Sequence, residues 1–138
     1  MDAPFKTTRR VQFHETDAAG ICHFSSFFTY MEEAEHEMLR HCGLRVFHET
    51  ETETISWPRV SAACDFRNPI RFEEIIDIEV RVVERTRRSV TYGFRFSRDG
   101  KLIAEGRMTS VCCRMTENGP RAIEIPDWIE RKLPPCRN

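Results

Sequence analysis

Residues 16–43 read TDAAGICHFSSFFTYMEEAEHEMLRHCG, a tight turn followed by one long helical pattern. Apolar side chains recur at spacings of three and four, which places them on one face of a helix. Basic residues close the last turn, and Gly43 stands where a left-handed residue commonly ends a helix. Ser25 or Ser26 is the expected N-cap. The pattern predicts a bounded amphipathic helix with a buried stripe of Phe27, Met31, Ala34, Met38 and Cys42.

The turn before this helix brings a carboxylate close to backbone donors. The first N–H groups of a helix have no partner within it, so they stabilise an oxygen that becomes negative during a reaction. Phe24 offers such a donor, and Gly20 lets the loop fold sharply enough for Asp17 to reach an electrophilic carbon. The stretch therefore points to acyl transfer. Asp before Gly also commonly caps its own turn, so a structural role for Asp17 stays open.

After the helix, the hydrophobic pattern changes to period two, which is typical of strands with one buried face. The β-half is expected to begin near Trp57, with a first run over residues 60–66. Clean alternation follows over residues 76–82 and 90–97. Asp99-Gly100 then predicts a two-residue type I′ hairpin leading into a final strand that ends at about Arg114.

One strand beginning at Val11, one long helix and four further strands make an α+β domain, in which the helix packs on a five-stranded antiparallel sheet. A short final segment is expected over residues 127–132. A chain of 138 residues, of which 40% are hydrophobic, fits one domain covering residues 1–138. Because such a sheet exposes its edges and one face, oligomerisation is expected.

Charge and composition narrow the classes of partner. With 21 basic and 22 acidic residues and a net charge of −1, the chain has no overall field that would attract nucleic acid or an anionic membrane. No apolar run approaches the roughly 20 residues of a spanning helix, and the polar start has no signal-peptide core, so a cytoplasmic location is expected. The six cysteines lack a C-x-x-C pair, so neither a metal site nor a disulfide framework follows.

These features resemble the hotdog-fold acyl-CoA thioesterases of the 4-hydroxybenzoyl-CoA thioesterase family. The resemblance implies that Asp17 is the catalytic carboxylate, as nucleophile or as general base for water, and that the backbone amide of Phe24 polarises the thioester carbonyl. Coenzyme A is then part of the substrate, and no cofactor is needed. The matching stretches are FHETDAAGI at 13–21, HCGL at 41–44, RRS at 87–89 and RAIEIP at 121–126.

The resemblance also implies an assembly and a coenzyme A site. Members of the family form dimers with the acyl pocket at the subunit boundary, usually assembled into tetramers. The family places contacts to the coenzyme A phosphates near Arg87 and Arg88, and arginine binds phosphate through charge-assisted bonds. Basic residues in a bend, Arg85 included, are otherwise simply solvated. Arg67 and Arg71 are weaker candidates for the same role.

Several residues are candidates for binding the acyl group. Glu32 lies near a position where aryl-thioesterase relatives carry an acid, so it either meets a polar acyl substituent or belongs to the solvated cluster with Glu33, Glu35 and Glu37. Aromatic residues supply either a pocket or the core, and the resemblance slightly favours an aryl acyl group. The candidates for substrate binding are Gly20, Phe27, Glu32 and Trp57, and other aromatics near the pocket are Phe24, Phe28 and Tyr30.

Possible helpers of Asp17 surround the turn. His23 is a third catalytic candidate, able to hydrogen-bond the thioester or tune Asp17, but a packing role is the alternative. Family members carry an aromatic residue at His23 and an aliphatic one at Cys22, so we expect Cys22 to be a packing group rather than a nucleophile. His14 and Glu15 end the preceding strand and point to opposite faces, and neither is expected to react.

Hydrolysis is expected by one of two routes. Asp17 either adds to the thioester carbonyl, giving a mixed anhydride that water opens, or activates water directly. A thiol with a pKa near 8.5 is a good leaving group, so no general acid is required. A non-catalytic acyl-CoA-binding subunit is the main rival. An enoyl-CoA hydratase on the same fold would want a histidine and aspartate dyad, and no convincing pair is evident.

Overall fold

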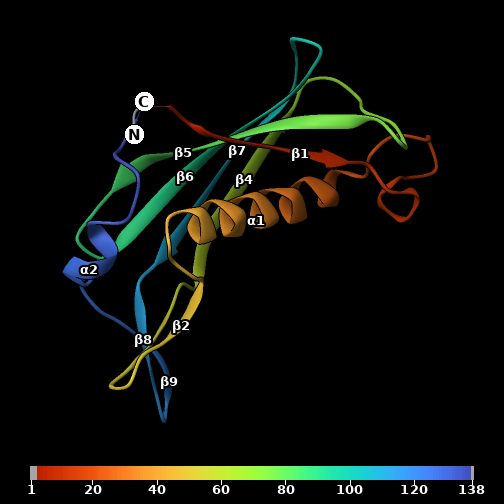
Figure 1. Cartoon of the computed structure of the whole chain (residues 1–138). Coiled ribbons are helices and arrows are strands. Elements are labelled where there is room, and N and C mark those ends of the chain that lie inside the picture. Colours follow the sequence, from red (N-terminus) through yellow and green to blue (C-terminus); the bar gives the residue numbers. More distant parts are fainter. Residues whose placement is uncertain (1–2, 138) are drawn as a thin grey trace.

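In the computed structural model, which describes residues 3–137, helix α1 (Phe24–His41) lies across one face of a five-stranded antiparallel sheet (Figure 1). The strand order is β1-β5-β6-β7-β4, so β1 and β4 form the two edges. The predicted α+β class and five-stranded sheet are thus confirmed. The strands are β1 (Phe5–Arg10), β4 (Arg59–Phe66), β5 (Ile75–Arg85), β6 (Ser89–Arg98) and β7 (Lys101–Val111).

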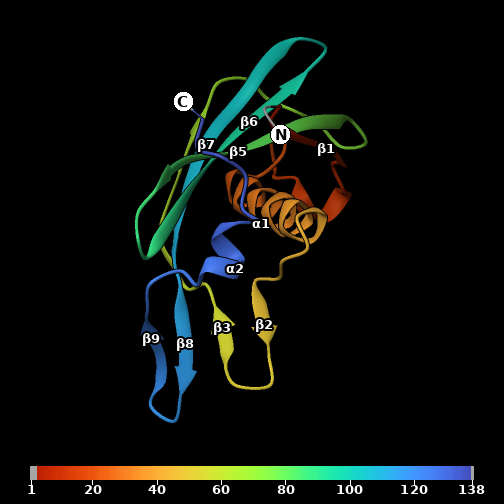
Figure 2. The same cartoon turned by 60° about the vertical axis from the view of Figure 1, so that its left-hand side comes forward.

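A second, four-stranded sheet continues below the first and was not predicted (Figure 2). The expected single final strand through Arg114 is wrong, because β7 ends at Val111 and after Cys112 the chain enters the second sheet, where Cys113 pairs with Ser56. The strands after the helix begin at Phe47, earlier than expected. The first two have three residues each, too few to show an alternation of apolar and polar residues. The order is β2-β3-β8-β9, formed by β2 (Phe47–Glu49), β3 (Thr54–Ser56), β8 (Cys113–Thr116) and β9 (Gly119–Ala122).

The helix follows its predicted stripe but not its predicted N-cap. Four of the five stripe residues are buried, and Cys42 is half-buried just after the last turn. Gly43 has a φ of +79°, as expected for the residue that ends the helix. The N-cap is His23 rather than Ser25 or Ser26, because the ring Nδ1 of His23 accepts the Ser25 N–H at 3.2 Å.

The chain reaches the helix by a different path from the one predicted. The expected strand from Val11 is wrong: β1 ends at Arg10, and the chain then forms the short 3-10 turn η1 (Phe13–Glu15). Val11 is fully buried, and its carbonyl accepts the Glu73 N–H at 2.9 Å, which anchors the end of β1 to the loop before β5. The turn therefore starts two residues after a fixed point on the sheet edge.

The hairpin between β6 and β7 is of the predicted type. Asp99 and Gly100 have φ values of +50° and +77°, the pair of left-handed residues that a type I′ turn requires. The short C-terminal segment forms α2 (Asp127–Glu130), within the predicted range. Among helices of residues 3–137, none is both long and apolar enough to cross a membrane.

Two ion pairs with buried carboxylates lie at opposite edges of the sheet. Arg59 of β4 makes a bidentate pair with Glu35, with Nη2 to Oε1 at 2.8 Å and Nη1 to Oε2 at 3.2 Å. Glu35 is only 1% exposed, so its place in a solvated acidic cluster is wrong. On the other edge, Arg9 of β1 pairs with Glu15 of η1, which is 7% exposed and is described below.

Close packing of α1 on β7 yields a test. A Cβ added at Gly106 would collide with the Met31 thioether and lie 3.2 Å from the Ala63 carbonyl oxygen, and Met31 is fully buried. We expect Gly106→Ala to lower the free energy of unfolding by about 1–3 kcal/mol, the usual cost of overpacking. Urea titration measures it. In a Met31→Ala background the extra methyl should cost much less, and an equal cost in both backgrounds would disprove this contact.

Candidate active site

Asp17 is held in an Asx turn, and only one of its oxygens is used. Its Oδ1 accepts the Ala19 N–H at 2.8 Å and the Ile21 N–H at 3.4 Å, while its own N–H donates to the Ile21 carbonyl at 2.8 Å. Gly20, with a φ of +81°, closes the loop. Within residues 3–137, Oδ2 has no hydrogen-bond partner. The turn thus presents one carboxylate oxygen for chemistry.

The N-terminus of α1 offers an unused donor beside this turn. His23 caps the helix through Nδ1, which also lies 2.8 Å from the Ser25 hydroxyl. The Ser26 N–H donates to the His23 carbonyl at 2.9 Å. The Phe24 N–H, by contrast, has no acceptor in the described part of the chain. Capping therefore accounts for one nitrogen of His23, and the Phe24 N–H is available to an incoming oxygen.

Asp17 and Phe24 line the same cleft, whose volume is about 480 Å³. Its walls are mostly apolar. Phe27, which is only 4% exposed, forms part of the wall. The Phe66 ring lies edge-on to Phe24 and Phe27, with centroids 6.4 and 5.3 Å apart. The other lining residues are Ile21, Cys22, Arg67, Asn68, Pro69 and Ile70.

The end of β4 and the loop after it, residues 66–70, form a wall of the cleft of which the sequence analysis named only Arg67. The Asn68 side chain donates to the Leu102 carbonyl at 2.6 Å, and the Cys22 N–H donates to the Ile70 carbonyl at 2.7 Å. These bonds fix the loop between β7 and the Asp17 turn. Only the Asn-Pro pair at 68–69 marks a turn here, and it says nothing about which surface the loop faces.

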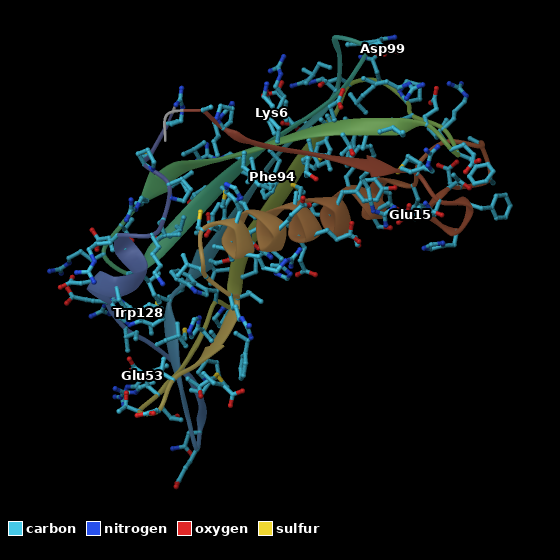
Figure 3. The ribbon with its side chains drawn as sticks, in the orientation of Figure 1. Lys6, Glu15, Glu53, Phe94, Asp99 and Trp128 are labelled. Carbon is cyan, nitrogen blue, oxygen red and sulfur yellow. The ribbon has the colours of Figure 1, made fainter. Side chains whose placement is uncertain are left out.

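Glu15, two residues before Asp17, is a buried carboxylate with three sources of hydrogen bonds. It is 7% exposed and lies at the N-terminal end of α1 (Figure 3). Oε1 accepts from the Tyr30 hydroxyl at 2.8 Å and from the Gln12 N–H at 2.8 Å, and Oε2 accepts from Arg9 Nη2 at 2.7 Å. Burial opposes the charge, but the donors outweigh it and hold the pKa of Glu15 below its ordinary value.

Cys22 is placed as a packing group. The residue is 6% exposed, its thiol lies 3.6 Å from the Tyr30 hydroxyl, and burial raises the pKa of Cys22. A raised pKa disfavours the thiolate that a nucleophile needs. Within residues 3–137, no group of three or more His, Cys, Asp or Glu is arranged to hold a metal ion.

Among the remaining candidates Arg67 lines the cleft, whereas Glu32, Trp57, Arg87 and Arg88 lie away from it within one chain. Glu32 is 55% exposed at its side chain and pairs with Arg59 at 3.4 Å, and Trp57 is a core residue with 8% exposure. Arg87 and Arg88 lie in the exposed turn between β5 and β6, beside α2 and at the opposite end of α1 from Asp17 (Figure 1). Their roles in binding stay predictions.

A two-layer domain of one long helix on an antiparallel sheet, with a carboxylate and a free helix N–H in one cleft, has the features of an acyl-transfer enzyme. The Thioesterase-like superfamily model matches residues 11–133, so the chain belongs to this superfamily. The predicted family and thioester hydrolase class are thereby confirmed.

Individual relatives and solved structures agree with this family assignment. The chain is 30% identical over 132 residues to a 1,4-dihydroxy-2-naphthoyl-CoA hydrolase of Prochlorococcus marinus (strain MIT 9303), covering 91% of this chain and 86% of the relative. A hypothetical protein from Thermus thermophilus superposes with a TM-score of 0.83 at 34% identity, over 93% and 95% of the two chains. A 4-hydroxybenzoyl CoA thioesterase shares the fold, with a TM-score of 0.81 at 18% identity over 96% and 99% of the chains.

The lowered pKa of Glu15 makes a prediction about stability and pH. Because the native state favours the carboxylate, Glu15 stabilises the fold at neutral pH, and this contribution is lost as the pH falls below the usual carboxyl range near 4.5. We expect Glu15→Gln to destabilise the protein by about 1–3 kcal/mol at pH 7. Chemical denaturation at several pH values should show the gap to wild type narrowing in acid.

Glu33→Gln is the matched control, because Glu33 also pairs with Arg9 but is 48% exposed at its side chain. Its effect should stay below about 1 kcal/mol, as for other exposed ion pairs. A gap between Glu15→Gln and wild type that is constant with pH would contradict the assignment of Glu15 as a buried carboxylate.

Proposed function

We propose that the protein hydrolyses an acyl-CoA thioester to the free acid and coenzyme A, with Asp17 as the reacting carboxylate. One observation carries the proposal: among residues 3–137, Oδ2 of Asp17 and the Phe24 N–H have no hydrogen-bond partner, and the two residues share a cleft. A carboxylate and an oxyanion donor are the two groups that attack on a carbonyl requires. The superfamily match supports the same chemistry.

The Phe24 N–H binds the carbonyl oxygen as it becomes negative, and the helix N-terminus adds its partial positive charge. In the nucleophilic route, a bond forms between an Asp17 oxygen and the thioester carbon, the C–S bond breaks, and the thiolate leaves. Water then opens the mixed anhydride and restores the carboxylate. In the general-base route, Asp17 takes a proton from the water that attacks the thioester carbon, the C–S bond breaks, the thiolate leaves, and the proton then passes from Asp17 to solvent. Both routes start from ionised Asp17.

The acyl group is proposed to be apolar and preferably aromatic. Phe24, Phe27 and Phe66 surround the cleft with ring edges and faces, and rings of this kind favour edge-on or offset contacts with an aryl group. The related Prochlorococcus protein is named for an aryl substrate, 1,4-dihydroxy-2-naphthoyl-CoA. His23 is proposed to orient the helix start rather than to react, since its Nδ1 is occupied by the cap.

The coenzyme A part is proposed to extend across a subunit boundary. Arg87 and Arg88 do not lie at the Asp17 cleft of their own chain, so a phosphate contact from them requires a second copy. Edge strand β4 has an exposed Val60, and Phe24 and Phe66 are 60% and 47% exposed at the cleft. A partner that covers these side chains would also satisfy the open strand edge. We therefore favour a dimer or tetramer.

Asp17→Asn tests the reaction. The amide oxygen of Asn can still accept the Ala19 N–H, so the turn is preserved while the charge is lost. On a panel of aryl, short-chain and long-chain acyl-CoA esters, we expect wild type to release thiol from at least one ester and Asp17→Asn to lose about a hundredfold or more in rate. Asp99→Asn, in the exposed hairpin, is the control and should keep full activity.

The outcomes separate the alternatives. Unchanged turnover by Asp17→Asn would remove Asp17 from the chemistry. Binding of a coenzyme A derivative with every ester intact would replace the enzyme by an acyl-CoA-binding subunit. Loss of enoyl-CoA absorbance without thiol release would indicate a hydratase.

The proposed oligomeric state is tested by measuring the molar mass of the protein in solution. Light scattering on the eluting protein should give at least twice the 16.3 kDa of one chain. An active species of monomeric mass would refute a site that needs a second copy.

A further inference from the structure

We infer that Glu15, Tyr30 and Ser26 form a positioning unit that sets the distance between the Asp17 carboxylate and the Phe24 N–H. The inference rests on the proposed function and adds to it three residues that do not line the cleft. Asp17 lies on a loop and Phe24 on a helix, so the reaction needs something that fixes one relative to the other. Glu15 provides that connection through both its main chain and its side chain.

The main chain of Glu15 is bonded to the start of the helix. Its carbonyl accepts the His23 N–H at 2.8 Å and the Ser26 hydroxyl at 3.1 Å. These donors come from the N-cap and from the first turn of α1, on either side of Phe24. Because Glu15 is only two residues before Asp17, the loop cannot shift at this point without breaking one of these bonds.

The side chain of Glu15 is bonded one turn further along the same helix. Oε1 accepts the Tyr30 hydroxyl at 2.8 Å, and Tyr30 is fully buried. Arg9 joins the group from β1, stacking its guanidinium 4.9 Å from the centre of the Tyr30 ring while bonding Glu15 at 2.7 Å. The main chain and the side chain of Glu15 thus bind the helix at two successive turns. Two points of attachment also prevent rotation of the loop.

The burial of the group explains why the connection is rigid. A carboxylate that is 7% exposed cannot exchange its protein partners for water, so each donor is held in place. None of these residues has an atom in the cleft that a substrate would touch. Loosening them should therefore leave substrate binding intact and misplace Asp17, and an error of about 1 Å in a reacting group costs roughly a hundredfold in rate.

The test compares Tyr30→Phe and Ser26→Ala with wild type on the best ester of the panel. We expect each variant to lower kcat by about 10- to 100-fold with KM within about twofold of wild type. Ser26→Thr, which keeps the hydroxyl, should restore most of kcat. Tyr92→Phe is the matched control, because it removes the hydroxyl of another buried tyrosine, on β6, that takes no part in this group.

A second comparison shows whether the effect passes through Asp17. In an Asp17→Asn background, Tyr30→Phe should change the residual rate by less than about twofold, since residues that act as one unit are not additive. Circular dichroism at the assay temperature confirms that each variant is folded. If Tyr30→Phe fails to fold, Ser26→Ala carries the test, because it removes one partly exposed hydroxyl.

The outcomes that overturn the inference differ from those that overturn the function. Wild type that hydrolyses no ester refutes the proposed function. Active wild type with Tyr30→Phe and Ser26→Ala at full kcat refutes the positioning unit. A loss shared by Tyr92→Phe, a parallel rise in KM, or no rescue by Ser26→Thr would each assign these residues to general stability instead.

Discussion

The buried charge of Glu15 is the constraint on which the site depends. An ion without partners in a protein interior costs several kcal/mol, so Glu15 can be buried only if the chain brings donors to it. Those donors come from β1 (Arg9), from the residue before η1 (Gln12) and from α1 (Tyr30). One charge therefore determines how the sheet edge, the turn and the helix meet. The cleft lies beside this junction, so the positions of its residues depend on these bonds.

Helix α1 is connected to both edges of the sheet through a buried carboxylate. At one edge Arg9 of β1 pairs with Glu15 of η1, which accepts the Tyr30 hydroxyl of α1. At the other edge Arg59 of β4 pairs with Glu35 on the helix itself. Between these edges the contact is apolar, and Gly106 leaves room for the Met31 side chain to lie directly on β7. Apolar packing is non-directional, whereas bidentate ion pairs have one geometry. The two pairs thus select one position of the helix.

The sequence predicted what depends on local pattern. The helical stripe, Gly43 and the Asp99-Gly100 hairpin were correct because spacing and backbone conformation determine them. The alternative of a solvated acidic cluster is wrong for Glu35, because the four acids of that cluster look alike in the sequence until the position of Arg59 is known. The N-cap was misplaced, since His23 caps through a ring nitrogen that propensity alone does not favour over serine. Contacts between segments far apart in the sequence, such as residues 66–70 against the Asp17 turn, cannot be predicted from the spacing of residue types.

The two roles considered for Asp17 do not exclude each other. An aspartate that caps its own turn uses one oxygen, and a carboxylate that attacks a carbonyl or activates water also needs one. In this turn Oδ1 accepts the Ala19 N–H, and Oδ2 has no partner in the part of the chain that the structure describes. The cap then restricts the rotation of the carboxylate, so less conformational freedom is lost when the reactive oxygen is aligned. The structural bond is therefore an aid to the proposed chemistry, and the turn motif predicts both roles.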